Sequence, residues 1–245
     1  MKGRGKVSKQ VNFGEIFGNS VSAMGEPHLA CVLLLDVSES MEGNPIASLN
    51  QAINRFKDQV CRDEIARKRV DIAIVSFATD VNVVCDFVPI EKMPVINLEA
   101  EGITMMAEGI DKAIDMVKER NAFYEKIGIP FFKPWIFMIT DGLPNSDDEE
   151  MQRVADRIYV EENAGSHGKL KFWVLGIEGY DSSEMFRLTK RVVELKDHDF
   201  TGIFDWLSES MASISRSTVG QKVALERLPE NARKAKDDRA IDEDW

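Results

Sequence analysis

Three short segments of the chain carry oxygen-bearing side chains whose types and spacing could hold a metal ion. The first is CVLLLDVSES, in which five apolar residues lead directly into Asp36, followed by Ser38 and Ser40. Carboxylate and hydroxyl oxygens suit hard cations such as Mg²⁺, Mn²⁺ or Ca²⁺, whereas zinc and copper sites favour His and Cys. This segment therefore predicts a buried strand that opens into a cation-binding loop.

Two later segments could bring further oxygens to the same place. Thr104 follows Gly102 and Ile103, and Asp141 comes just after an apolar run at residues 135–139. Ligands of open α/β sheets bind at the carboxyl ends of the strands, so Asp141 is expected at the same edge as the first loop. The predicted metal ligands are Asp36, Ser38, Ser40, Thr104 and Asp141. No residue is predicted to be catalytic or to bind an organic cofactor, and the three histidines are not expected to act as ligands.

The rest of the chain alternates predicted strands with predicted amphipathic helices. Strands are expected at residues 70–77, 169–177 and 192–195 besides those that precede the two Asp residues, and residues 81–87 should form a hairpin with 70–77. Residues 146–149 are predicted to be a capping box that opens a helix. This alternation predicts a doubly wound, Rossmann-like α/β fold with a mostly parallel sheet, one antiparallel edge strand and helices on both faces.

Composition and charge indicate the bounds of the domain, its class of partner and its location. Residues 28–217 form the predicted domain, between a polar N-terminal extension (1–27) and a charged C-terminal tail (218–245). The formal net charge of −11 argues against nucleic acid as a partner. No stretch approaches the roughly 20 apolar residues of a membrane span, and the first residues lack the apolar core of a secretory signal. Three cysteines, an odd number, favour reduced thiols and a cytoplasmic location.

The order Asp-x-Ser-x-Ser, then Thr, then Asp resembles the metal-ion-dependent adhesion site of von Willebrand factor A domains, over roughly residues 28–217. The resemblance implies a divalent cation, Mg²⁺ first, whose shell is completed by an acidic residue of a protein partner. Glu39 and Ile103 depart from the motif, because many members of the family carry Gly at these positions. Four apolar residues on the same loops could form an adaptable rim: Met41, Met105, Met106 and Leu143.

Within this class, several segments resemble the TerY-like proteins associated with tellurium-resistance gene clusters. They are LLLDVSESMEGNPIASLNQAI, the Lys133-Pro134-Trp135 approach to FMITDGLP, and FDWLSESMASISRS. The resemblance implies an intracellular interaction module, monomeric when alone, that acts in tellurium resistance, stress response or phage defence alongside kinase or phosphatase partners.

Two other functions are alternatives to this prediction. The chain could be a subunit of a chelatase-like assembly, although it has no ATPase motif and would need an ATPase from another polypeptide. It could also be a phosphotransferase with Asp36 as the nucleophile, but the acid expected two residues later is replaced by Ser38. No base for Ser38 or Ser40 is apparent, so the chain is expected not to be an enzyme.

Overall fold

The structure is a computed structural model that describes residues 23, 25–164 and 169–236. Most of the predicted N-terminal extension, His167 and the last nine residues lie outside the described part of the chain. The central feature is a sheet of seven strands in the order β3-β2-β1-β4-β5-β6-β7. Its strands are β1 (Leu29–Asp36), β2 (Val70–Phe77), β3 (Val81–Pro89), β4 (Trp135–Thr140), β5 (Lys171–Gly176), β6 (Val192–Leu195) and β7 (Ala232–Lys234).

The sheet is mostly parallel, as predicted. Strand β1 lies between β2 and β4, and β5 and β6 continue the parallel order beyond β4. The hairpin prediction is confirmed, because β3 pairs antiparallel with β2 at one edge. A second antiparallel strand, β7, pairs with β6 at the other edge and was not predicted.

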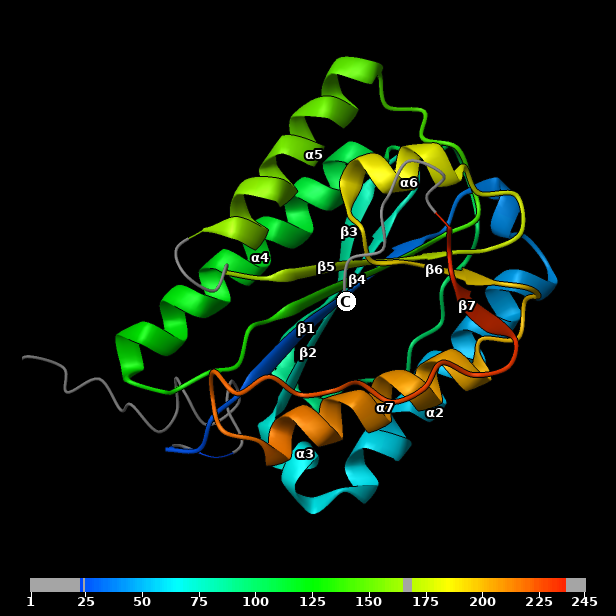
Figure 1. Cartoon of the computed structure of the whole chain (residues 1–245). Coiled ribbons are helices and arrows are strands. Elements are labelled where there is room, and N and C mark those ends of the chain that lie inside the picture. The colour runs from blue at the N-terminus through cyan, green and yellow to red at the C-terminus, as the bar shows by residue number, and fades with distance from the viewer. Residues whose placement is uncertain (1–22, 24, 165–168, 237–245) are drawn as a thin grey trace, which may run out of the picture.

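Helices cover both faces of the sheet (Figure 1). One face packs against α2 (Asn44–Arg62), α3 (Glu64–Arg69) and α7 (Thr201–Arg216), and the other against α4 (Met106–Ile127), α5 (Asp148–Asn163) and α6 (Ser182–Leu188). Side chains that alternate along β1 supply both cores: Leu33 and Leu35 face α2 and α7, whereas Val32 and Leu34 face α4. The doubly wound α/β fold is therefore confirmed. No helix in the described residues is both long and apolar enough to cross a membrane.

Residues 218–236, the described part of the predicted charged tail, pack against the domain. Val223, Leu225 and Leu228 contact the core, and the indole Nε1–H of Trp206 donates to the carbonyl oxygen of Glu226 at 2.8 Å. The segment then ends in β7. These apolar residues thus anchor the chain along α7 before it reaches the sheet edge.

Two short 3-10 helices, η1 (Glu39–Met41) and η2 (Ile90–Lys92), complete the fold. The capping box before α5 is shifted by one residue from its predicted position. Asp147 is the N-cap, and its side chain and that of Glu150 bond each other's backbone N–H groups. Ser146 lies before this N-cap, and its Oγ accepts a hydrogen bond from the backbone N–H of Ala107 at 3.0 Å.

Candidate metal centre

The two predicted carboxylate ligands lie side by side at the carboxyl end of the sheet. Asp36 is the last residue of β1, and Asp141 directly follows β4. These strands are hydrogen-bonded neighbours in parallel register, with Leu35 opposite Ile139. The two apolar runs that define the strands in the sequence therefore bring their terminal carboxylates to one edge.

Hydrogen bonds and one close contact between hydroxyl oxygens link four of the five predicted ligand residues. Oδ1 of Asp36 accepts from the backbone N–H of Ser38 at 3.0 Å and from its hydroxyl at 2.6 Å. The hydroxyls of Ser38 and Ser40 are 3.1 Å apart, and Ser40 donates to Oδ1 of Asp141 at 2.7 Å. Thr140, which was not predicted as a site residue, donates to Oδ2 of Asp36 at 2.6 Å.

Thr104 reaches the same place from a third loop. A methyl group built on Gly142 would lie 3.5 Å from Oγ1 of Thr104, 3.9 Å from Oδ2 of Asp36 and 3.9 Å from Oγ of Ser40. Three candidate ligand oxygens thus surround one point beside a residue that has no side chain. The structure brings all five predicted ligand residues together in this cradle.

Neighbouring loops hold Thr104 in place. Its backbone N–H donates to Oδ1 of Asn145 at 2.8 Å, and the Asn145 N–H donates back to the Thr104 carbonyl at 2.8 Å. Gly102 has φ of +78°, and a Cβ there would lie 2.2 Å from Oγ1 of Thr79, so this loop requires glycine. Asn145 and Thr79 were missed because no local pattern marks them: their partners are distant in the sequence.

The site concentrates negative charge in a buried place. Asp36 is fully buried, and Ser38, Thr104 and Asp141 are 2%, 5% and 9% exposed, whereas Ser40 is open to solvent. Burial raises the pKa of Asp36, hydrogen bonds from Ser38 and Thr140 oppose that rise, and the charge of Asp141 adds to it. Among the described ion pairs, none joins a Lys or Arg to either carboxylate.

The donor set fits a hard divalent cation. Two carboxylates and three hydroxyls supply only oxygen, and they converge on a cradle that a methyl group would fill. The described residues contain no group of three or more His, Cys, Asp or Glu arranged to hold a metal. A metal site here would therefore depend on hydroxyl ligands as well as carboxylates.

The predicted apolar rim is partly wrong. Met41 and Met106 are fully buried in the two cores, because η1 and the first turn of α4 point them inward. Leu143 is 59% exposed as predicted, and Met105 is half-buried. Ile103, which directly precedes Thr104, is 50% exposed. Two exposed apolar residues, rather than four, therefore flank the candidate ligands.

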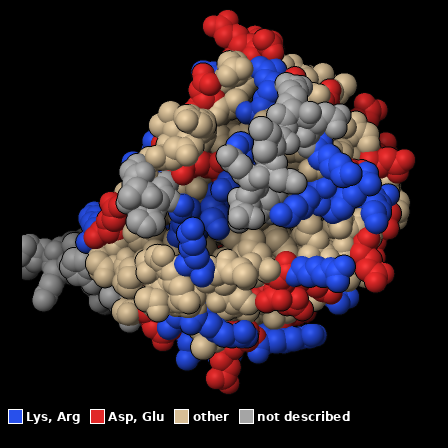
Figure 2. All heavy atoms as spheres, in the orientation of Figure 1, with Lys and Arg blue, Asp and Glu red and all other residues tan. Residues whose placement is uncertain are grey.

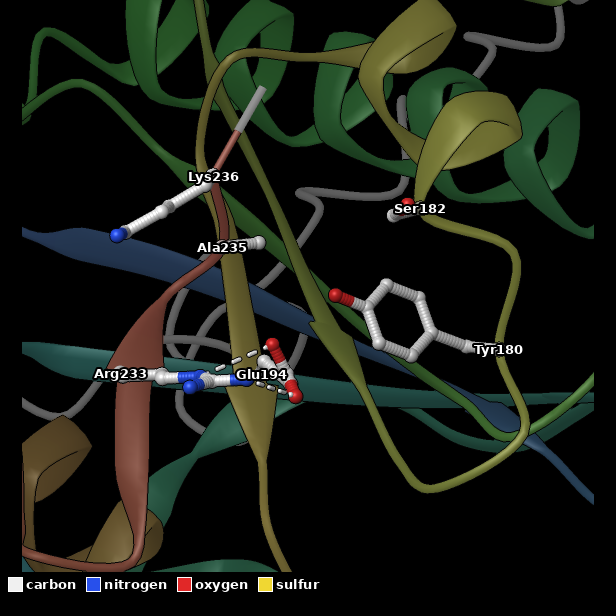
Figure 3. A pocket seen from close by; sticks show the side chains of 6 residues that line it. All are labelled: Tyr180, Ser182, Glu194, Arg233, Ala235 and Lys236. Atoms are coloured by element: carbon white, nitrogen blue, oxygen red, sulfur yellow. Dashed lines mark hydrogen bonds and ion pairs between the residues drawn. The ribbon is translucent and has the colours of Figure 1, made fainter. Parts of the chain in front are cut away.

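A separate hollow lies at the β7 edge of the sheet (Figure 3). It has a volume of about 360 Å³ and is lined by Tyr180, Ser182, Glu194, Arg233, Ala235 and Lys236. Arg233 and Glu194 form an ion pair across it at 2.9 Å, and burial with the nearby Glu194 charge raises the pKa of Tyr180 to about 12. None of the predicted metal ligands lines this hollow.

Comparison with known proteins shows what part of this domain is similar to. Residues 31–143 match the family described as von Willebrand factor type A domain, and this range contains all five candidate ligands. No curated protein gives a significant sequence match. This part of the chain is therefore similar to von Willebrand factor type A domains, and the fold agrees with that similarity.

Several solved structures share this fold at low sequence identity. A von Willebrand factor type A protein from Catenulispora acidiphila superposes with a TM-score of 0.59 at 14% identity, over 77% of this chain and 43% of that protein. The pilus adhesin SpaC from Lactobacillus rhamnosus GG, in an open conformation, gives 0.63 at 12%, over 79% and 31%. Proximal thread matrix protein 1 of the mussel byssus gives 0.53 at 16%, over 76% and 48%. This chain therefore spans less than half of each of these proteins.

Proposed function

We propose that this protein is a metal-dependent protein-interaction module. One observation carries the proposal: Asp36 and Asp141 lie together in a buried site, each bonded by a serine hydroxyl, and no described Lys or Arg pairs with them. Burying negative charge without a counter-charge is costly, so a bound cation is the natural partner of this arrangement. Von Willebrand factor type A domains commonly mediate protein interactions, which agrees with binding rather than catalysis.

The cation we propose is Mg²⁺, with Mn²⁺ and Ca²⁺ as the other oxygen-preferring ions. Ser38, Ser40 and Thr104 would supply hydroxyl oxygens, and Asp36 and Asp141 would supply charge directly or through bound water. Ser40 is the exposed member of the set, so a remaining coordination position would face solvent on its side. An acidic side chain from a partner could occupy that position.

The surroundings of the site suit a partner with mixed chemistry. Ile103 and Leu143 offer apolar contact near the ion, whereas the exposed Glu39 adds negative charge between the two serines. His28 is not free to act as a base at this site, because its ring bonds Asp71 and the carbonyl of Ala23.

The biological setting we propose comes from sequence resemblance. The segments similar to TerY-like proteins support a role in tellurium resistance, stress response or phage defence, with kinase or phosphatase partners. All three cysteines are free thiols, which favours a reducing compartment such as the cytoplasm.

Partner capture tests this function. Immobilised full-length protein is exposed to lysate with Mg²⁺ or with EDTA, beside Ser40→Ala and the control Ser217→Ala, whose hydroxyl bonds only the end of α7. With Mg²⁺, we expect wild type and the Ser217→Ala control to capture the same set of partners. These partners should not be captured in EDTA, nor by Ser40→Ala. Capture that ignores both EDTA and Ser40→Ala would contradict a metal-dependent module.

A further inference from the structure

A basic cluster lies at the opposite end of the sheet from the candidate ligands. It consists of Lys133, Lys171 and Arg191, which stand at the amino ends of the neighbouring strands β4, β5 and β6. Figure 2 shows Lys and Arg side chains gathered near the middle of the face that is seen in Figure 1. This concentration of positive charge is notable because the chain as a whole carries a net charge of −11.

Backbone and ring contacts hold the basic cluster together. The backbone N–H of Lys171 donates to the carbonyl oxygen next to Lys133, that of Pro134, at 2.9 Å. The ammonium of Lys171 lies 5.8 Å from the Trp135 ring centroid, and the Arg191 guanidinium lies at 5.9 Å from that of Trp173. The cationic heads therefore rest on adjacent rings, whose centroids are 5.3 Å apart.

The positive charge of the cluster is only partly neutralised. Among the described residues, one carboxylate pairs with it: Glu162 lies 2.6 Å from Arg191 and also accepts from the backbone N–H of Phe172 at 2.7 Å. Three cations and one carboxylate leave a local charge of +2. Burial lowers the pKa of Lys133 and of Lys171, and the positive charge of Arg191 lowers both further. The fold thus holds like charges together against their repulsion.

We propose that the basic cluster binds a phosphate group, either as a free anion or on a phosphorylated residue of a partner. A phosphate monoester carries about −1.5 to −2 charges at neutral pH, which matches the local excess of +2 better than a single carboxylate would. Arg and Lys together are the side chains best suited to phosphate oxygens. All three heads are partly exposed, so a ligand can reach them.

The test measures phosphate binding to the full-length protein in EDTA, which keeps it independent of the metal site. Inorganic phosphate and a phosphoserine peptide are titrated calorimetrically at constant ionic strength into wild type, Lys171→Gln and the control Lys126→Gln, an exposed lysine at the end of α4. We expect saturable binding to wild type and control, at least about tenfold weaker for Lys171→Gln. Tighter binding of the peptide identifies a phosphorylated partner, and equal binding identifies the free anion.

A second readout separates a binding role from a structural one. Lys171→Gln removes a repelling charge, so without phosphate its melting temperature should equal or exceed that of wild type. Should this variant fail to fold, Lys133→Gln, which lies outside the strands, gives the same comparison. Absence of saturable binding of both probes to wild type, or equal binding to variant and control, would overturn the proposal.

Discussion

Two buried aspartates on neighbouring strands differ in how their charge is balanced. Asp36 ends β1 and Asp71 lies near the start of β2, and both side chains are fully buried. Oδ2 of Asp71 accepts from Nη2 of Arg120 at 2.9 Å, lies 2.9 Å from Nδ1 of His28, and is bonded by the hydroxyl of Tyr124. Asp36 has only neutral donors, and a second carboxylate lies nearby.

The contrast separates a structural charge from one placed for a ligand. At the amino end of the sheet, Arg120 neutralises Asp71 from within the chain and lies within 5.2 Å of the ring centroids of Phe87, Phe123 and Tyr124. At the carboxyl end, no described residue plays that part for Asp36. We infer that Asp71 stabilises the fold, whereas Asp36 is placed to bind an external cation.

The largest change in the free energy of unfolding should come from Asp71→Asn. This change leaves the Arg120 charge buried without its partner, and breaking such a pair typically costs about 3–5 kcal/mol. Urea denaturation should show that loss equally with Mg²⁺ and with EDTA. A loss that appears only when Mg²⁺ is present would break the contrast, because Asp71 would then belong to the metal response.

A smaller loss is expected for Asn145→Ala, which removes the amide that positions Thr104. Outer residues that orient metal ligands typically change metal affinity by about tenfold or more. We expect about tenfold weaker Mg²⁺ binding by calorimetry, with a loss of roughly 1 kcal/mol in the free energy of unfolding in EDTA. Unchanged Mg²⁺ affinity would remove Thr104 from the proposed ligand set.

In metal-free protein, Asp36→Asn should raise the free energy of unfolding, whereas Asp71→Asn should lower it. Removing one of two adjacent buried carboxylate charges relieves repulsion and desolvation, for a gain on the order of 1 kcal/mol in the free energy of unfolding. Urea denaturation in EDTA measures it. A loss as large as that of Asp71→Asn would mean that the Asp36 charge is already balanced within the chain.

The smallest expected effect is the pH dependence of the stability that Asp36 contributes. Because the pKa of Asp36 is raised in the folded protein, its contribution to stability is present below the unfolded pKa and is lost as pH rises through the folded pKa. In EDTA, the melting temperature of wild type minus that of Asp36→Asn should fall over that range. A flat difference curve would show that burial does not perturb this carboxyl group.

Much of the fold and the gathering of the candidate ligands were predictable from local pattern. The apolar runs before Asp36 and Asp141 set two adjacent parallel strands, and strands at 70–77 and 192–195 match β2 and β6 residue for residue. Strand ends in a doubly wound sheet meet at one edge, so the two carboxylates had to converge there.

What local pattern could not predict depends on partners that are distant in the sequence. Strand β7 has one buried apolar residue, Ala232, and follows a segment that packs on the core through Val223, Leu225 and Leu228. Arg120 and Asp71 are 49 residues apart, and nothing in either neighbourhood marks them as a pair. Met41 carried no signal for its direction either, because a single short turn decides whether it faces the core.

The most direct test of the central claim is calorimetric titration of Mg²⁺ into wild type, Asp36→Asn and Asp205→Asn. Asp205 is a matched control, because it lies on α7 and pairs with Arg55 away from the site. We predict saturable binding at one site in wild type and Asp205→Asn, and none in Asp36→Asn although that variant is folded. Absence of binding to folded wild type, or equal binding to Asp36→Asn, would contradict the claim that these buried carboxylates are placed for a cation.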